Sequence, residues 1–240
     1  MANALEVRDA WVGYERDIDI LQGVTLELAE GSLTGMIGLN GAGKTTLTKT
    51  IYGFLTPRRG GVYLRGEEIT GVEPHTLIQR GVWYLPQDSS LFPFLSVDDN
   101  LRLPAKALDL PKADVEDRVA RTLDEFPDLR KWSRKHAGDL SGGQRTMLEC
   151  AKVSIVQPDI LIVDEPSVGL APKIALQIYE QIATFHRAGM SLFLIDHNVR
   201  KVIELADYIY VMNMGRITSE GGRDAFQGEL TEQVQKWLGL

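Results

Sequence analysis

The chain has 240 residues, 44% of them hydrophobic, and a formal net charge of −7. This composition allows one large hydrophobic core and excludes a disordered or fibrous protein. The negative charge argues against broad, sequence-independent nucleic-acid binding, which needs clustered lysine and arginine, so we expect no nucleic-acid partner. The apolar stretches fall far short of the ~20 residues that span a bilayer, and Cys150 is the single cysteine. We expect no signal segment and a cytoplasmic location.

Two segments of alternating apolar and polar residues open the chain. Residues 5–14 and 20–28 are separated by the charged turn 15–19, and this pattern predicts a β-hairpin. We expect the hairpin to form an antiparallel layer at the edge of the fold. Residues 33–37 form a short apolar run, which predicts a buried strand.

A glycine-rich loop follows this strand. Residues 38–45 read Gly-Leu-Asn-Gly-Ala-Gly-Lys-Thr and match the pattern G-x-x-x-x-G-K-[ST]. In such a loop, backbone N–H groups surround phosphate oxygens, the lysine reaches the outer phosphates and the threonine hydroxyl meets Mg²⁺. A helix is predicted at 44–55, which completes the required order of strand, loop and helix. The competing interpretation is an ordinary glycine-rich turn. We expect ATP and Mg²⁺ to bind here through Gly38, Leu39, Asn40, Gly41, Ala42, Gly43, Lys44, Thr45 and Thr46.

The remainder of the chain predicts further strands and a helical insertion. Charged residues interleave with Leu, Val and Ala at helical spacing from about residue 97 to 156, which predicts a helical subdomain. We expect one α/β domain over residues 1–240, with a nucleotide-binding core made of residues 1–96 and 157–240. The remaining strands are predicted at 62–64, 82–85, 160–163, 192–195 and 208–212, and a helix at 173–187.

Two acidic residues end the apolar strand at 160–163. Asp164 and Glu165 stand where the carboxyl end of a parallel strand faces the usual ligand crevice. In phosphoryl transfer one such carboxylate holds the metal while another group orients or deprotonates the attacking water. We assign Asp164 to Mg²⁺, largely through water, and Glu165 to the attacking water as general base. The alternative is an acidic pair that merely ends the strand.

A third motif, Leu140-Ser141-Gly142-Gly143-Gln144, lies between the other two. In order and spacing, the three motifs resemble those of the ATP-binding subunit of an ABC transporter, over nearly the whole chain. The resemblance implies a P-loop NTPase core, ATP hydrolysis and a head-to-tail dimer in which this segment caps the γ-phosphate held by the other subunit. Ser141 and the amides of Gly142 and Gly143, at the start of a helix, would make a second anion site beside Gln144. The alternative is a flexible Ser-Gly linker.

The resemblance assigns roles to three more residues. Tyr14 matches the aromatic residue on which adenine stacks, although a buried core tyrosine is the competing interpretation. Gln87 matches the glutamine that approaches Mg²⁺ and the γ-phosphate and connects to the membrane domain. His197 matches the switch histidine that contacts the γ-phosphate, where the alternative is a hydrogen-bonded structural histidine.

Two transporter subfamilies compete, and a non-transport class stays open. Residues 165–172 resemble the cassette of branched-chain amino-acid and urea importers, which we favour, whereas residues 196–200 resemble the lipopolysaccharide export cassette. Ala171 replaces the aspartate that is common at this point in the wider family. The third possibility is a soluble ATPase of iron–sulfur assembly. The transporter interpretation implies transmembrane permease subunits, a second ABC ATPase subunit and an extracytoplasmic solute-binding protein, with this chain on the cytoplasmic face of the plasma membrane.

The segment after Gln87 is unusually apolar for a loop. Leu91, Phe92, Phe94 and Leu95 lie within five positions. In transporter cassettes the matching region receives a short cytoplasmic helix of the membrane subunit, and apolar anchors of this kind suit a helix in a groove. We therefore predict a docking surface here. Local core packing is the alternative.

Overall fold

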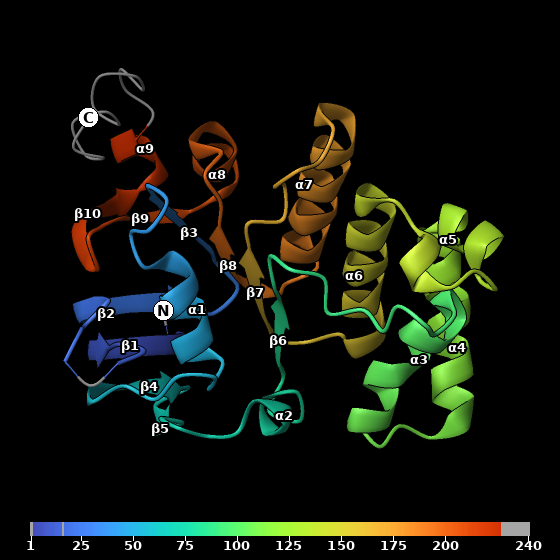
Figure 1. Ribbon diagram of the computed structural model, residues 1–240, viewed down its shortest axis with the longest axis horizontal. Coiled ribbons are helices and arrows are strands. Elements are labelled where there is room, and N and C mark those ends of the chain that lie inside the picture. Colours follow the sequence, from blue (N-terminus) through green and yellow to red (C-terminus); the bar gives the residue numbers. More distant parts are fainter. Residues whose placement is uncertain (1, 16, 227–240) are drawn as a thin grey trace.

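Two sheets form the framework of the computed structural model, which describes residues 2–15 and 17–226 (Figure 1). The larger sheet is parallel except for β10, which pairs antiparallel with β9. The smaller sheet is antiparallel. In spatial order the larger sheet contains β10 (Arg216–Gly222), β9 (Tyr208–Asn213), β3 (Leu33–Gly38), β8 (Ser191–Ile195), β7 (Ile160–Asp164) and β6 (Val82–Leu85), and the smaller contains β2 (Leu21–Ala29), β1 (Asn3–Val12), β4 (Arg59–Leu64) and β5 (Glu67–Glu68).

The helices are spread along the sheets, and some of them cluster at one end of the molecule (Figure 1). Helix α1 follows the glycine-rich loop, whereas α3 to α6 gather at the end of the molecule opposite the smaller sheet. In the part of the chain that the structure describes, no helix is both long and apolar enough to cross a membrane. The helices are α1 (Lys44–Ile51), α2 (Pro74–Leu77), α3 (Val97–Ala107), α4 (Lys112–Glu125), α5 (Pro127–Trp132), a 3₁₀ turn (Ala137–Asp139), α6 (Gly142–Val156), α7 (Pro172–Arg187), α8 (Val199–Leu205) and α9 (Arg223–Phe226).

The core lies on both faces of the larger sheet. Side chains of a strand alternate between its faces, so Leu192 and Leu194 of β8 belong to the cluster formed with the helices. Phe193 and Ile195 belong to the cluster formed with the smaller sheet and α1. Burial on both faces explains why β3, β7 and β8 are nearly continuous apolar runs.

The α/β fold with an antiparallel layer and helices between its strands confirms the predicted class. The helices at 97–156 occupy the predicted insertion, and the domain boundaries remain predictions, with residues 227–240 outside the described part. The predicted helix at 44–55 is too long. It ends at Ile51 because the N–H groups of Phe54 and Leu55 turn back to Lys49 O around Gly53, which has φ +81°.

Strand β4 begins at Arg59, earlier than the predicted 62, and therefore contains Gly60 and Gly61. Gly60 has φ +78°, and a Cβ there would lie 2.1 Å from Asp9 O on the paired strand. Glycine is therefore required for the close approach of β1 and β4. Strand β10 was not predicted, because its residues are mostly polar or glycine and it pairs at the sheet edge.

A stability prediction follows from the two-faced core. Phe193→Ala should lower the free energy of unfolding by about 3–5 kcal/mol, because it opens a cavity at a fully buried position of the central sheet. Urea denaturation followed by circular dichroism measures the change. Phe94→Ala is the matched control, since that ring is 86% exposed, and it should change stability by no more than about 0.5 kcal/mol. Equal losses in both variants would contradict this description of the core.

Candidate functional site

The glycine-rich loop joins β3 to α1 at the carboxyl edge of the larger sheet. Gly41 and Gly43 have φ of +80° and +107°, which side chains rarely allow. Gly43 is the N-cap of α1, so the unpaired N–H groups of the first helical turn face the loop. A Cβ on Gly38 would lie 2.4 Å from Met212 O, which fixes that position as glycine. The loop is thus a backbone cradle suited to an anion.

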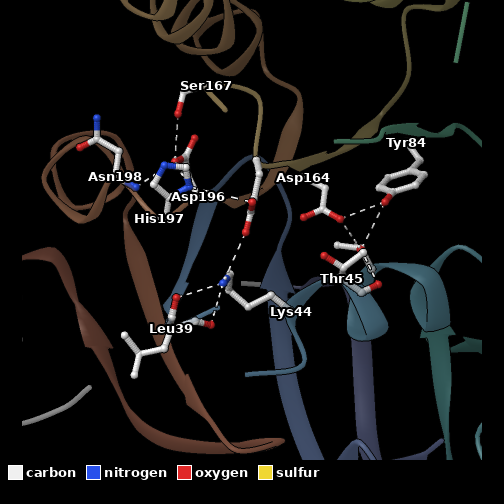
Figure 2. A network of polar contacts seen from close by, with 12 residues as sticks. Leu39, Lys44, Thr45, Tyr84, Asp164, Ser167, Asp196, His197 and Asn198 are labelled. Carbon is white, nitrogen blue, oxygen red and sulfur yellow. Dashed lines mark hydrogen bonds and ion pairs between the residues drawn. The ribbon is translucent and has the colours of Figure 1, made fainter. Parts of the chain in front are cut away.

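Lys44 lies inside this loop rather than in solvent. Its Nζ donates to Gly38 O and Leu39 O, both at 3.0 Å, and lies 3.4 Å from Glu165 Oε1 (Figure 2). Both side chains are largely buried. The loop carbonyls and Glu165 therefore hold the ammonium group of Lys44 at the point where the outer phosphates of a nucleotide would lie.

Asp164 is fully buried and has one oxygen without a partner. Its Oδ2 accepts from Thr48 Oγ1 at 2.9 Å and from Tyr84 OH at 3.0 Å (Figure 2). Among the described residues, Oδ1 finds no hydrogen-bond donor. Burial raises the pKa of Asp164, whereas a cation on Oδ1 would favour its ionised form. An unsatisfied buried carboxylate oxygen calls for a ligand, and a hard cation fits it.

Glu165 and His197 face each other beside Lys44. His197 Nδ1 lies 3.9 Å from Glu165 Oε2 and 3.7 Å from Asp196 Oδ1. The backbone of Glu165 has φ +48°, and its N–H donates to Ile195 O at 2.8 Å. Left-handed backbone at a non-glycine residue costs about 1–3 kcal/mol and persists where its surroundings hold it, commonly at functional sites.

A cleft of about 500 Å³ unites most of the predicted site residues. Tyr14 is 59% exposed at its rim, so the competing interpretation as a buried core residue is wrong. Asp164 lies beneath the cleft, and Gly38, Leu39 and Ala42 contribute to the loop rather than to the lining. The lining contains Tyr14, Ile20, Asn40, Gly41, Gly43, Lys44, Thr45, Thr46, Gln87, Glu165, Val168 and His197.

The segment 140–144 does not line this cleft. Ser141 is the N-cap of α6: its Oγ accepts from Gln144 N at 3.4 Å, and Gln144 Oε1 accepts from Ser141 N at 2.8 Å. The segment is a helix start and not a flexible linker. Gly142 lines a separate hollow with Gln87 and Glu165, and Gly143 packs against Ile174 of α7.

Sequence reasoning missed several residues that shape the site. Thr48 and Tyr84 bond Asp164, and Val168 lines the cleft. Asp196 was also missed as a site residue, although it ends an apolar strand as Asp164 does, and that position was a usable signal. Ala171 is the N-cap of α7 and offers no side-chain cap.

Comparison with known proteins decides the family. A family model described as "ABC transporter" matches residues 21–168. The chain belongs to the ABC transporter family. As in that family generally, it is an ATP-binding subunit whose reaction is ATP hydrolysis. ATP-binding subunits of such transporters work with transmembrane permease components.

Relatives and solved structures match nearly the whole cassette. The "Probable branched-chain amino acid transport ATP-binding protein LivF" of Archaeoglobus fulgidus is 38% identical over 87% of this chain and 88% of its own. BraG, named a high-affinity branched-chain amino acid transport ATP-binding protein, of Pseudomonas aeruginosa is 34% identical over 90% and 96%. The ADP conformation of MJ1267, an ATP-binding cassette of an ABC transporter, is 29% identical with a TM-score of 0.84 and covers 99% of this chain and 98% of that one.

Replacing the proposed base separates catalysis from nucleotide binding. Glu165→Gln keeps the size of the side chain but removes the proton acceptor, so hydrolysis should fall about 10²–10⁴-fold while ATP still binds. Phosphate release and equilibrium ATP binding by the purified cassette measure the two effects. Lys44→Ala should instead weaken binding itself, because it removes the buried cation.

The matched control is Glu180→Gln, the same change at an exposed position of α7. It should leave both quantities unaltered. Hydrolysis by Glu165→Gln at the unmodified rate would show that another group is the base.

Proposed function

We propose that this cassette powers import of branched-chain amino acids or a related small polar solute. The run Ser167-Val168-Gly169-Leu170-Ala171-Pro172 supports this assignment, and two relatives of 34% and 38% identity are named for branched-chain amino acid transport. A lipopolysaccharide export protein, LptB of Acidithiobacillus ferridurans, is similar at 29% identity, below the two amino-acid transport relatives, so export is the less favoured candidate. The iron–sulfur assembly alternative has no comparable support.

The arrangement of charges supports a sequence of events at the phosphate cleft. Lys44 is paired with Glu165 at 3.4 Å. Phosphate oxygens that enter the loop would take the lysine as their own partner and leave the Glu165 carboxylate to accept a proton from the attacking water. His197, on the far side of Glu165, contacts the γ-phosphate in this proposal. The switch from ion pair to base is thus driven by nucleotide binding.

Mg²⁺ fits the oxygens beneath the cleft. Among the described residues, buried Asp164 Oδ1 has no hydrogen-bond partner, and Thr45 and Gln87 line the nucleotide cleft. The described residues hold no cluster of three or more metal-binding side chains, which agrees with a cation that takes few protein ligands and relies on phosphate and water. When bound, Mg²⁺ would neutralise charge on the outer phosphates.

The second anion site requires a second ATPase subunit. The helix start at Ser141 does not line the phosphate cleft of its own chain. Gly142 faces a separate hollow that shares Gln87 and Glu165 with that cleft. We propose that Ser141 and Gly142 meet nucleotide held by the other subunit of a dimer, with two ATP molecules at the interface. Helix N-termini favour anions through their free N–H groups and dipole.

Mixing two inactive variants tests this shared site. Ser141→Arg blocks the helix start and Lys44→Ala disables the phosphate loop, so a mixed dimer retains one complete site composed of both chains. ATP hydrolysis should partly return on mixing, while each variant alone stays inactive. The control is each variant mixed with a second preparation of itself. Absence of an ATP-dependent dimer by light scattering, even for Glu165→Gln, would contradict the shared site.

An aromatic groove supports docking of a permease subunit. A hollow of about 640 Å³ is lined by Tyr52, Phe54, Trp83 and Tyr84 and extends to Ser90. It is continuous in sequence with the predicted docking loop. A groove lined by aromatic side chains suits an apolar helix. We propose that this helix belongs to the permease and is presented on the cytoplasmic side of the membrane. In the full importer, an extracytoplasmic solute-binding protein would deliver the solute to that permease.

The apolar loop beside the groove is divided between two roles. Phe92 and Phe94 are 56% and 86% exposed, whereas Leu91 packs against the main core. The core-packing alternative therefore holds for Leu91, and the exposed rings remain available to a partner. Exposed aromatic rings of this kind are typical interface anchors.

A buried ion pair connects this loop to α6. The Glu149 carboxylate accepts from Ser90 N at 2.6 Å and pairs with Lys152 Nζ at 2.9 Å. Lys152 Nζ also donates to Ser90 Oγ at 2.9 Å and lies 5.6 Å from the Trp83 ring centroid in the groove. Motion of α6 on nucleotide binding would therefore carry the loop that follows Gln87, and with it a docked helix.

Membrane association tests the docking surface. Phe94→Glu should release the cassette from membranes of cells that express the full transporter, because a charge replaces an exposed apolar anchor. Cell fractionation measures the release, with circular dichroism and ATP binding as checks on folding.

Leu176→Glu places the same charge at another exposed apolar residue, on α7, and should leave association intact. Equal membrane association of all three proteins would remove this loop as the docking surface. If the unmodified cassette copurified with no membrane protein, the soluble ATPase alternative would replace the transporter assignment.

A further inference from the structure

Asp196 is a carboxylate with no exposed surface at the end of β8. Its Oδ1 accepts from Ser167 Oγ at 3.1 Å and from Asn198 N at 2.8 Å (Figure 2). Its Oδ2 accepts from Tyr179 OH at 2.9 Å. Burial of a carboxylate is costly unless it is hydrogen-bonded, and here both oxygens are satisfied by protein groups.

This environment distinguishes Asp196 from Asp164, the other buried aspartate at the same sheet edge. In the described part of the chain, Asp164 has one oxygen without a hydrogen-bond partner, whereas both oxygens of Asp196 accept hydrogen bonds from protein groups. Its three donors come from the loop after Glu165, from the turn after His197 and from helix α7. Asp196 is therefore the point at which three segments around the cleft are held together.

The bonds of Asp196 fix the backbone on both sides of His197. The Asn198 N–H is bound by Asp196, and Asn198 Oδ1 in turn accepts from Lys201 N at 3.3 Å as the cap of α8. Val199 N donates to His197 O at 2.9 Å. The half-exposed imidazole of His197 therefore projects from a turn that is held by hydrogen bonds.

The same carboxylate restrains the loop of Glu165. Ser167 follows Glu165 by two residues and is tied to Asp196. The left-handed backbone of Glu165 needs such restraint, since a strained residue persists only where its neighbours hold it. Val168, the next residue, lines the nucleotide cleft. A shift of this loop would move the carboxylate of Glu165 relative to His197.

We propose that Tyr179 and Asp196 are positioning residues that hold the side chains of Glu165 and His197 in the relative position that ATP hydrolysis requires. The proposal rests on the proposed roles of Glu165 and His197. Tyr179 lies on α7, is 3% exposed and does not line the cleft, so it acts indirectly, through its hydrogen bond to Asp196. Burial above all raises the pKa of Tyr179, which keeps its hydroxyl protonated as a donor.

Removal of one hydroxyl group tests the proposal. In Tyr179→Phe, kcat for ATP hydrolysis should fall about tenfold, because the reacting groups are less well positioned. KM for Mg·ATP should stay within about twofold, since the phosphate loop that binds the nucleotide is untouched. Steady-state kinetics of the purified cassette give both quantities.

Tyr210→Phe is the matched control. Tyr210 is 5% exposed on β9, its hydroxyl accepts from Glu27 N at 3.0 Å, and it lines a hollow separate from the nucleotide cleft. Loss of this hydroxyl should lower the melting temperature about as much as Tyr179→Phe does, with kcat unchanged. The pair separates a structural hydrogen bond from a positioning one.

A second position guards against misfolding of the first variant. Ser167→Ala removes another donor to Asp196 from a half-buried loop and should lower kcat in the same way, whereas Ser167→Thr keeps a hydroxyl and should retain it. If the unmodified cassette hydrolyses ATP and both Tyr179→Phe and Ser167→Ala keep its kcat, the positioning role is overturned and the proposed function stands. No hydrolysis by the unmodified cassette overturns the proposed function and this role together.

Discussion

Because β3, β8 and β7 pair in parallel, their carboxyl ends meet at one edge of the larger sheet. The phosphate loop leaves β3 after Gly38, Asp164 ends β7, and Asp196 follows β8. The register places Asp164 beside Ile195. A slip of one residue would turn each strand's side chains to the opposite face, so the register of the sheet contributes to bringing Lys44, Asp164 and Glu165 together.

The charged groups at this edge differ in how many of their hydrogen-bonding atoms have a partner. Lys44 is held by loop carbonyls and Glu165, and Asp164 lacks one partner, while Asp196 lacks none. In a low-dielectric setting, incomplete satisfaction is costly. A bound nucleotide with Mg²⁺ would relieve that cost at Asp164 and would give Lys44 a phosphate partner, but it would offer nothing to Asp196. At this edge, Asp164 and Lys44 would therefore change partners when a ligand binds, whereas Asp196 would keep its own.

Much of this arrangement was predictable from local sequence. The phosphate loop and the acidic pair after an apolar strand are continuous motifs, and buried parallel strands are recognisable as apolar runs. The convergence of Ser167, Tyr179 and Asn198 on Asp196 was not predictable, because it joins residues on separate elements. The end of α1 at Ile51, by contrast, is set by a local turn around Gly53.

The burial of individual side chains was the property that was hardest to predict from the sequence. Glu149 and Lys152 stand three positions apart on a helix, a spacing typical of a solvated surface pair, yet both are buried under the docking loop. Tyr14, in contrast, is aromatic and close to the end of a strand but exposed. In each case the neighbouring layer, which no local pattern encodes, determines which side chains solvent reaches.

The left-handed backbone at Glu165 places chemistry and thermal stability in opposition at one position. Glycine and asparagine adopt φ +48° with less strain than glutamate does, so the residue best suited to the conformation is not the residue that can take a proton. A cassette selected only for thermal stability would be expected to lose its base here first. At position 165, glutamate therefore lowers the free energy of unfolding while it supplies the proposed base for ATP hydrolysis.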